Sequence, residues 1–303
     1  NSQDYHSHIK EVGHLSVNEH SNITVEFSDI DYDTNSLILL SLINRPGIYY
    51  QHNNGTSFNL TVNLRSIIEW DKWSKNHSFE NNWLSETLQS LAKSVSPLVC
   101  GPYNFKDSPS ERAKLIQSTT INEICPSIFF SNVSRGWSHE MVRHRLGAIS
   151  QRSTRYVDES ESNWCWHPLI HQYNSYLENK YKDCNTLETL RPFALEEIDG
   201  NLESVKQEAE TTYSDTVNKL QNYLVTNGID KFTARKQSRG AARGILGNAL
   251  ATEMLYTTSL KNWQHIIKMR ARDAADAEIR VVFNEVYELL SNRWPEMFVG
   301  WST

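Results

Sequence analysis

Hydrophobic positions recur with two different periods along the chain, which predicts both strands and helices. Ile23, Val25 and Phe27 alternate with polar residues, as in a strand with one buried face. Over 201–227 the apolar residues recur every three or four positions and predict a long amphipathic helix, which Gly228 ends. That stripe consists of Leu202, Val205, Ala209, Tyr213, Val217, Leu220 and Leu224.

The other predicted elements are short and mixed in kind. Further strands are expected over 57–62, 128–130 and 250–257, and a polar, aromatic stretch without clear period over 157–185 predicts loops and short turns. Further helices are expected over 1–12, 63–73 and 79–95, from Pro109, and over 231–246, 259–270 and 273–291. Because no regular strand–helix–strand alternation occurs, the pattern predicts the α+β class.

Charge, apolar content and cysteine spacing indicate which kinds of partner the chain is not expected to bind. The formal net charge is −6, which gives no general basic character for nucleic acid or anionic membranes, so we expect neither partner. No apolar run approaches the ~20 residues that span a bilayer, and no signal peptide is visible. The four cysteines match no metal-binding spacing, which predicts reduced thiols in a cytoplasmic protein and no metal site.

Positive charge is nevertheless concentrated in one segment, 134–156. It holds Arg135, Arg143, Arg145, Arg152 and Arg155. Ser134 is a candidate N-cap for a helix running through Arg145, with Gly147 just past its end. This clustering suits a phosphorylated, hydrogen-bonding ligand such as a nucleotide. A solvated basic helix end is the alternative that the charge pattern alone leaves open.

The expected geometry of this segment gathers its polar side chains. On a helix, Glu140, Arg143 and His144 share a face, and Arg145 points elsewhere. After the turn at Gly147, alternation in an extended segment would place Gln151, Ser153 and Arg155 on one side.

The spacing Arg143-His144-Arg145, seven residues, then Ser153 resembles the signature of the flavin-dependent thymidylate synthases. The flanking Ser134-Arg135, His139-Glu140 and 150–156 are similar to that family as well. Gly13-His-Leu-Ser-Val-Asn-Glu-His20 resembles its flavin-site segment, and 235–280 resembles its C-terminal portion. The resemblance implies an α+β fold in which an antiparallel or mixed sheet is packed by long helices.

The resemblance also implies roles for individual residues. Nucleotide contacts would come from Arg143, Gln151, Ser153, Arg155, Arg243 and Arg270, with Glu140 close by. Among these, Arg143, Ser153 and Arg270 are the residues expected to act in catalysis. Arginines opposite the uracil carbonyls would stabilise the negative charge that develops as C5 attacks the carbon carrier, and Ser153 would be a hydrogen-bond donor. The flavin or folate side would be formed by His14, Ser16, Glu19, Arg145, Leu146 and His265.

For the whole protein, the resemblance implies reductive methylation of dUMP to dTMP. FAD would be the cofactor, with NADPH and methylenetetrahydrofolate as co-substrates. The assembly would be a homotetramer with active sites at subunit boundaries. Two alternatives remain open: methylation or hydroxymethylation of another pyrimidine nucleotide, and a non-catalytic homologue or a nucleotide- or nucleic-acid-binding module that uses the basic helix.

The chain departs from the family pattern in several places. Thr258-Ser259-Leu260-Lys261 stands where Gly-Asn-(Leu/Phe)-Arg is usual, and Ala274 stands in place of a flavin-contacting histidine. We expect a single domain over 1–303, interrupted by an insertion at 31–125. Within the insertion, Asn63 and Arg65 resemble the Asn-Leu-Arg motif that the tail lacks, which suggests the hypothesis that they replace its flavin contacts. A start at Asn1, already in a helical pattern, suggests that the natural N-terminus is missing.

Overall fold

The structure is a computed structural model of the 303-residue chain. The described residues are 2–11, 15–30, 48–54, 56–76, 83–95, 97–100, 103, 105, 110–111, 113–115, 125–181 and 191–301. His14 and Pro109 lie outside them. Contacts divide the chain into two units, and each is described by itself. Unit 1 comprises 1–129, 144–150 and 255–266; unit 2 comprises 130–143, 151–254 and 267–303.

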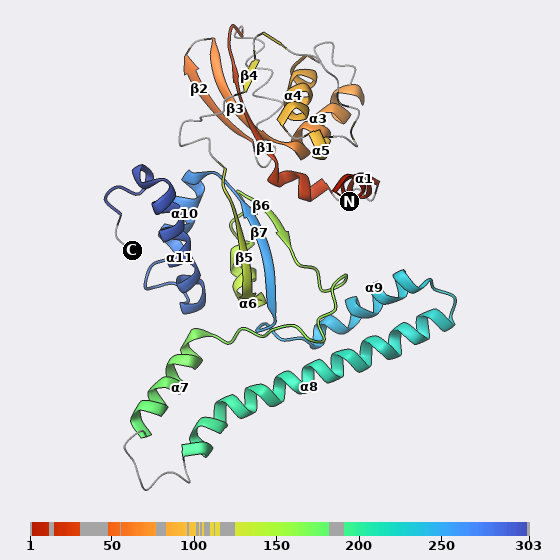
Figure 1. The fold of residues 1–303 in the computed structure, drawn as a ribbon, viewed down its shortest axis with the longest axis vertical. Coiled ribbons are helices and arrows are strands. Elements are labelled where there is room, and N and C mark those ends of the chain that lie inside the picture. Colours follow the sequence, from red (N-terminus) through yellow and green to blue (C-terminus); the bar gives the residue numbers. More distant parts are fainter. Residues whose placement is uncertain are drawn as a thin grey trace. The chain divides into compact units, whose positions relative to one another are not determined.

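Unit 1 is built on a four-stranded sheet in the order β2-β3-β1-β4 (Figure 1). Its strands are β1 (Asn22–Phe27), β2 (Tyr49–Asn54), β3 (Ser57–Asn63) and β4 (Ala113–Leu115), and every pairing is antiparallel. Val25 pairs with Leu60, and Phe27 with Phe58, so one face of the sheet is apolar. The other face is polar, and there Thr24 and Thr61 share a hydrogen bond of 2.9 Å.

Helices cover the apolar face of this sheet (Figure 1). They are α3 (Leu64–Asn76), α4 (Trp83–Val95) and α5 (Pro97–Cys100), and α1 (Ser2–Glu11) and the 3₁₀ helix η1 (Leu15–His20) precede β1. Ile67, Leu84 and Leu88 pack into one cluster with Phe27 and Phe58, whose rings stack with centroids 5.0 Å apart. The alternation at 23–27 therefore forms the buried face that its period predicts.

A second sheet has three strands in the order β5-β7-β6: β5 (Ser127–Ser134), β7 (Ala251–Thr257) and β6 (Ala148–Gln151). Residues of these strands belong to both units. On the unit 2 part of β5, Phe130 packs against Trp137, with centroids 4.8 Å apart, and against Phe283. This sheet carries the segments on either side of the Arg-His-Arg sequence.

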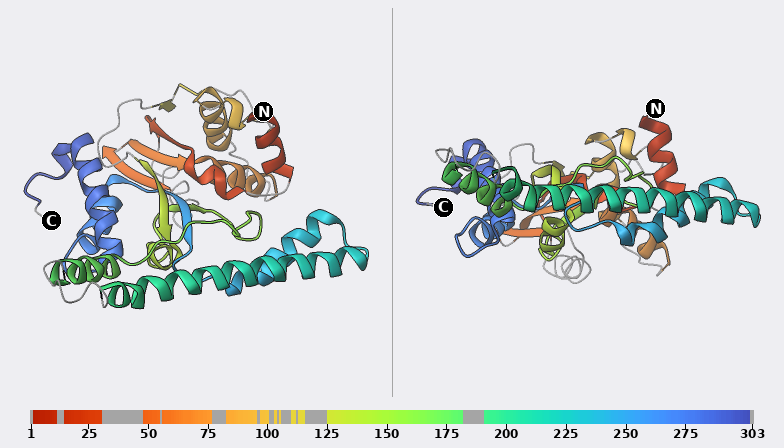
Figure 2. Two further views of the ribbon diagram at one scale, coloured as in Figure 1. Left: turned by 60° about the horizontal axis from the view of Figure 1, so that its bottom comes forward. Right: turned by 90° about the horizontal axis from the view of Figure 1, so that it is seen from below.

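Helices make up most of unit 2. They are α6 (Arg135–Met141), α7 (Pro168–Tyr181), α8 (Arg191–Thr226), α9 (Lys231–Ala242) and α11 (Ala277–Arg293), with the 3₁₀ helices η3 (Arg243–Ile245) and η4 (Pro295–Met297). α10 (Leu260–Arg270) has residues in both units. α8 and α9 lie side by side (Figure 2), and Tyr213, Val217 and Ala242 are buried between them.

Most predicted elements are confirmed, together with the α+β class. The strands near 23–27, 57–62, 128–130 and 250–257 form, as do the long helix through 201–226 and its end at Gly228, where φ is +84°. Three predictions are wrong. The helix that Ser134 caps ends at Met141 rather than Arg145, 113–115 form a strand rather than a helix, and 168–181 form helix α7 rather than a loop.

Candidate functional site

The Arg-His-Arg sequence lies in a turn and loop between α6 and β6. Ser134 caps α6, since its Oγ accepts a hydrogen bond from Trp137 N at 2.9 Å. The same hydroxyl donates to Glu278 of α11 at 2.9 Å, which fixes the start of the helix. Because the helix stops at Met141, Glu140, Arg143 and His144 do not share a face of one continuous helix, and that predicted arrangement is wrong.

Glu140 and Arg270 form an ion pair within unit 2, although 130 positions separate them in the sequence. Arg270 ends α10, and its side chain is 21% exposed against 39% for Glu140. The structure thus brings together two residues that were predicted to lie near the nucleotide. An anion that approaches this pair would meet a guanidinium already held by a carboxylate, so only part of its hydrogen-bonding capacity remains.

Gln151 is held by hydroxyl groups from two other elements. Its Nε2 lies 2.9 Å from Ser138 Oγ in α6 and 3.3 Å from Thr252 Oγ1 in β7. After Gln151 the chain turns: the Ser153 carbonyl accepts from Tyr156 N at 3.1 Å and from Val157 N at 3.0 Å. The predicted alternation of an extended segment at 151, 153 and 155 is therefore wrong beyond Gln151, which is the last residue of β6.

Arginines from two segments of unit 2 lie within electrostatic range of one another. Burial lowers the pKa of Arg135, and the charges of Arg152 and Arg243 act in the same direction, against the opposing effect of Glu159. Arg243 begins η3, and Arg155 reaches α9, where a Cβ added to Gly240 would lie 3.6 Å from its Cγ. Arg143, Arg155 and Arg243 are exposed, as ligand-binding cations require.

A buried carboxylate, which the sequence analysis did not single out, lies beneath this cluster. Glu159 is fully buried, and its Oε2 accepts from Arg152 Nη2 at 3.2 Å and from Ser162 Oγ at 2.5 Å. Arg135 Nη2 donates to the Arg152 carbonyl at 3.2 Å. A single sequence offers no local signal for this network, because Glu159 looks like any polar loop residue until its burial is known.

The turn is also tied to α9 through Tyr156 and Asp158. Arg239 donates to the Tyr156 carbonyl and to Asp158 Oδ2, both at 2.7 Å. Burial acts to raise the pKa of Asp158, but hydrogen bonds from Ser160 and the charge of Arg239 lower it below its ordinary value. Lys236 lies 4.8 Å from the ring centroid of Tyr156, and the pKa of this phenol is lowered mainly by its hydrogen bond to Lys236.

The residues predicted for the flavin side fall in unit 1. Arg145 and Leu146 lie in the loop before β6, both exposed, Leu146 by 66%. Ser16 on η1 and His265 on α10 are exposed as well. Glu19 is paired with Arg65 of α3, which also binds Glu69 at 2.7 Å.

Asn63 already has a structural role. Its Oδ1 accepts from Ser66 N at 2.8 Å at the start of α3, which is the bond of a helix cap. It is also buried, at 2% exposure. The capping bond and the ion pairs of Arg65 supply ordinary structural reasons for both residues, and the hypothesis that they bind flavin stays a prediction.

His20, at the end of η1, joins three elements of unit 1 through hydroxyl groups. Its Nδ1 lies 2.7 Å from Thr257 Oγ1 in β7, and its Nε2 lies 2.9 Å from Ser150 Oγ in β6. Thr257 Oγ1 also lies 2.6 Å from Ser127 Oγ in β5. Burial lowers the pKa of His20, so the ring is neutral at pH 7. The predicted flavin segment is thus connected to the sheet that carries the signature.

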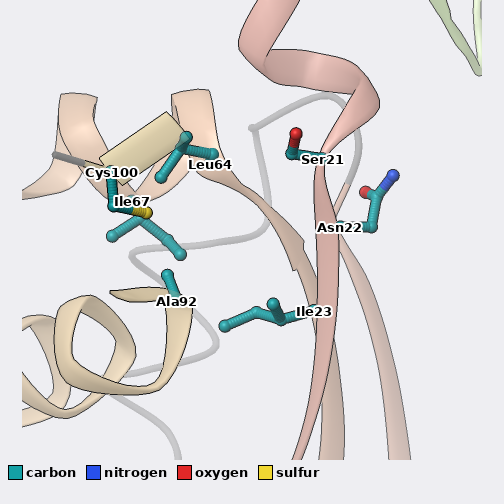
Figure 3. A pocket seen from close by; sticks show the side chains of 7 residues that line it. All are labelled: Ser21, Asn22, Ile23, Leu64, Ile67, Ala92 and Cys100. Atoms are coloured by element: carbon teal, nitrogen blue, oxygen red, sulfur yellow. The ribbon is translucent and has the colours of Figure 1, made fainter. Parts of the chain in front are cut away.

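A small hollow in unit 1 contains none of the predicted site residues (Figure 3). It is lined by Ser21, Asn22, Ile23, Leu64, Ile67, Ala92 and Cys100. Burial raises the pKa of Cys100 to about 11, so its thiol is protonated and unreactive at neutral pH. Among the described residues, no cluster of three metal-ligating side chains occurs. No helix in the described part of the chain is long and apolar enough to cross a membrane.

The exposed side chains fit the groups that the resemblance implies. Guanidinium groups bind phosphates through several donors at once, and unit 2 presents Arg143, Arg155 and Arg243 exposed. In unit 1, Arg145 presents another exposed guanidinium beside the apolar Leu146. A guanidinium suits a phosphate-bearing ligand, and the diphosphate of FAD is one such group.

Most of the chain matches a known protein family. The family described as thymidylate synthase complementing protein matches residues 113–296, more than half of the chain. The chain therefore belongs to this family. The matched residues contain the Arg-His-Arg signature, the buried Glu159 and the tail through Arg270, whereas the segment 13–20 lies outside them.

Individual relatives are flavin-dependent thymidylate synthases. That of Corynebacterium diphtheriae is 32% identical over 177 residues, covering 58% of this chain and 61% of the relative. That of Mycobacterium tuberculosis is 32% identical over 172 residues, covering 57% and 60%. The chain thus spans about three fifths of the length of these relatives. A crystal structure of thymidylate synthase X from Helicobacter pylori with FAD and dUMP aligns at a TM-score of 0.33 and 15% identity, covering 59% of this chain and 73% of that one.

Proposed function

We propose that the protein is a flavin-dependent thymidylate synthase, which converts dUMP to dTMP with methylenetetrahydrofolate as carbon donor and NADPH as reductant. The observation that carries the proposal is the unit 2 site. There the Glu140–Arg270 pair, the anchored Gln151 and the exposed Arg143, Arg155 and Arg243 belong to segments that match the family.

In this proposal the cations of unit 2 bind and orient the nucleotide. Arg143, Arg155 and Arg243 hold the phosphate and the base, and Ser153 donates a hydrogen bond to the substrate. Arg270, aligned by Glu140, stabilises the negative charge that develops on the uracil carbonyls as C5 attacks, because a preoriented guanidinium needs little reorganisation at that moment. Gln151 is fixed by Ser138 and Thr252, so its amide orientation is set before the substrate arrives.

The flavin side of the proposal rests on unit 1. Bound FAD would supply the reducing equivalents for the methyl group. Arg145, Leu146, His265, Ser16 and Glu19 would hold it, together with His14. The protein's own part is to bind and orient the cofactor.

The proposal extends to the whole protein. We infer a homotetramer with active sites at subunit boundaries and a cytoplasmic location.

The test is a product assay on the purified chain. We expect a yellow protein that turns dUMP into dTMP in the presence of FAD, NADPH and methylenetetrahydrofolate. Arg143→Ala and Arg155→Ala should each lower kcat/KM about a hundredfold or more, because each removes a charge-assisted contact to the substrate. Arg280→Ala is the matched control, since this arginine of unit 2 pairs with Asp273 instead.

The outcomes separate the alternatives. Turnover of dCMP or UMP in place of dUMP would indicate the related reaction on another pyrimidine nucleotide. Wild-type rates in both Arg143→Ala and Arg155→Ala would refute the site, and a colourless protein without turnover would indicate a non-catalytic homologue.

A further inference from the structure

The loop that carries Arg145 and Leu146 accepts hydrogen bonds from three side chains of the C-terminal tail, and all of these residues lie in unit 1. Tyr256 Oη donates to the His144 carbonyl at 2.8 Å. Thr258 Oγ1 donates to the Leu146 carbonyl at 2.6 Å, and Asn262 Nδ2 lies 3.4 Å from the same oxygen. Two backbone carbonyls, two residues apart, are thus bound by residues more than 100 positions further along the chain.

The donors are themselves fixed. Tyr256 is fully buried and packs edge-to-face against Trp263, with ring centroids 5.2 Å apart. Thr258 is 1% exposed, and Asn262 Nδ2 also lies 3.0 Å from its Oγ1. Buried, packed donors keep their positions, so the loop takes its conformation from the tail.

Gly147 provides a second, independent contact with the same tyrosine. A Cβ at position 147 would lie 2.4 Å from Tyr256 Cζ and 2.5 Å from Oη. Since real Cβ atoms do not approach this closely, the backbone at Gly147 and the phenol ring are matched in shape. The loop therefore follows Tyr256 on two sides, at the His144 carbonyl and at Gly147.

We propose that Tyr256 and Thr258 are positioning residues that hold the 144–147 loop so that the side chains of Arg145 and Leu146 face the cofactor. With the carbonyls of His144 and Leu146 bound to the tail, both of these side chains remain exposed. Thr258 and Ser259 stand where the family pattern has Gly-Asn. Here Thr258 holds the loop, and Ser259 Oγ accepts from Asn262 N at 3.3 Å at the start of α10.

This inference rests on the proposed function, because it assigns Arg145 and Leu146 to the flavin. Its test uses Tyr256→Phe and Thr258→Val, which remove one hydroxyl each and keep the shape of the side chain. Thr258→Ser retains the hydroxyl and is the rescue variant. Tyr287→Phe is the matched control for the tyrosine, since Tyr287 of α11 also donates its hydroxyl to a backbone carbonyl, that of Trp301, at 3.3 Å. Thr24→Val is the control for the buried threonine.

We expect the dissociation constant of FAD, measured by flavin fluorescence, to rise about tenfold in Tyr256→Phe and in Thr258→Val, because each removes a hydroxyl donor from a backbone carbonyl of the loop. Hydrogen–deuterium exchange should accelerate in the peptide that spans 143–150. In the turnover assay, kcat should fall while the KM for dUMP stays within about twofold. Thr258→Ser should restore FAD affinity, and the two controls should leave it unchanged.

Unchanged FAD affinity and exchange in both variants would overturn the inference, as would an equal loss of affinity in Tyr287→Phe and Thr24→Val. Failure of the proposed function is distinguishable from this result. If the wild-type chain binds no flavin, then the assignment of the cofactor is wrong, whereas the exchange of 143–150 still reports whether the two hydroxyls hold the loop.

Discussion

At the scale of single residues, several side chains of the candidate site act through position rather than through intrinsic reactivity. Glu140 holds Arg270, Ser138 and Thr252 hold Gln151, and a fully buried Glu159 holds Arg152. A fully buried carboxylate such as that of Glu159 is stable only because it is paired and hydrogen-bonded. The chemistry proposed for this family member therefore depends on neighbours that the signature does not contain.

The burial of His20 makes the free energy of unfolding depend on pH. Burial lowers its pKa in the folded chain, while in the unfolded chain the pKa returns to about 6.5. The unfolded state therefore binds the proton more readily. The free energy of unfolding should decrease as the pH falls through the window between 6.5 and the lowered folded value, and should be fully restored above 6.5.

Urea unfolding at pH 5.5 and pH 7.5 measures this effect. His20→Gln should flatten the dependence, by a slope no larger than about 1.4 kcal/mol per pH unit, because one titrating group is removed. His171→Gln, at an exposed histidine of α7, is the control and should keep the wild-type slope. Equal slopes in the wild type and in His20→Gln would contradict the role of burial.

At the scale of elements, the sequence predicted best where the structure is decided locally. The Ser134 cap, the long stripe of α8 and the stop at Gly228 depend on neighbours a few residues away, and all three are confirmed. The end of α6 is different. Arg143, His144 and Arg145 continue a pattern that is compatible with a helix, but Tyr256 and Thr258 bind the carbonyls of His144 and Leu146 from 112 residues away. No local pattern reports those contacts.

The two other missed elements have similar causes. The strand β4 has three residues and takes its register from β1, so its sequence carries little periodicity of its own. Helix α7 begins with Pro168, a residue favoured in the first turn, but its exposed Leu169, Tyr173 and Tyr176 obscure the apolar stripe that would have indicated a helix.

The turn between α8 and α9 contains Gly228, and Gly244 lies in η3 after α9. Gly228 has φ +84° and Gly244 does not have a positive φ, yet a Cβ at either position would meet open space. Gly228→Ala should lower the free energy of unfolding by about 1 kcal/mol, because the left-handed conformation is unfavourable for alanine. Gly244→Ala should leave it unchanged or raise it by about 0.5 kcal/mol, since alanine restricts the unfolded chain.

Chemical denaturation of the two variants beside the wild type checks this contrast. An equal shift of the denaturation midpoint in both variants would show that the backbone conformation at Gly228 does not determine the stability of the α8–α9 turn.

At the scale of the whole molecule, the residues predicted for the nucleotide and those predicted for the flavin belong to different units. The residues predicted to contact the nucleotide are in unit 2, and the described residues predicted to contact the flavin are in unit 1. This division follows from the chain itself, because the unit boundary falls between Arg143 and His144 and again after Ser150. The sequence predicted which residues belong to each half through the resemblance, whereas the Glu140–Arg270 pair and the buried Glu159 needed the fold.

The C-terminal part of the α8 stripe is covered by α9, where Tyr213 and Val217 are buried, but Val205 nearer the start of the helix is 55% exposed. In the proposed homotetramer this part of α8 would lie against another subunit. Burying one valine stabilises an interface by roughly 1.5 kcal/mol or more, and a buried unpaired aspartate opposes association. Val205→Asp should therefore raise the dissociation constant of the assembly at least about tenfold.

Light scattering across a dilution series measures the mass of the assembly against the 35.0 kDa of one chain. Val95→Asp, at a valine of α4 that is 52% exposed, is the matched control and should keep the wild-type mass. A wild-type mass of one chain, or an unchanged assembly in Val205→Asp, would show that α8 does not form the subunit contact.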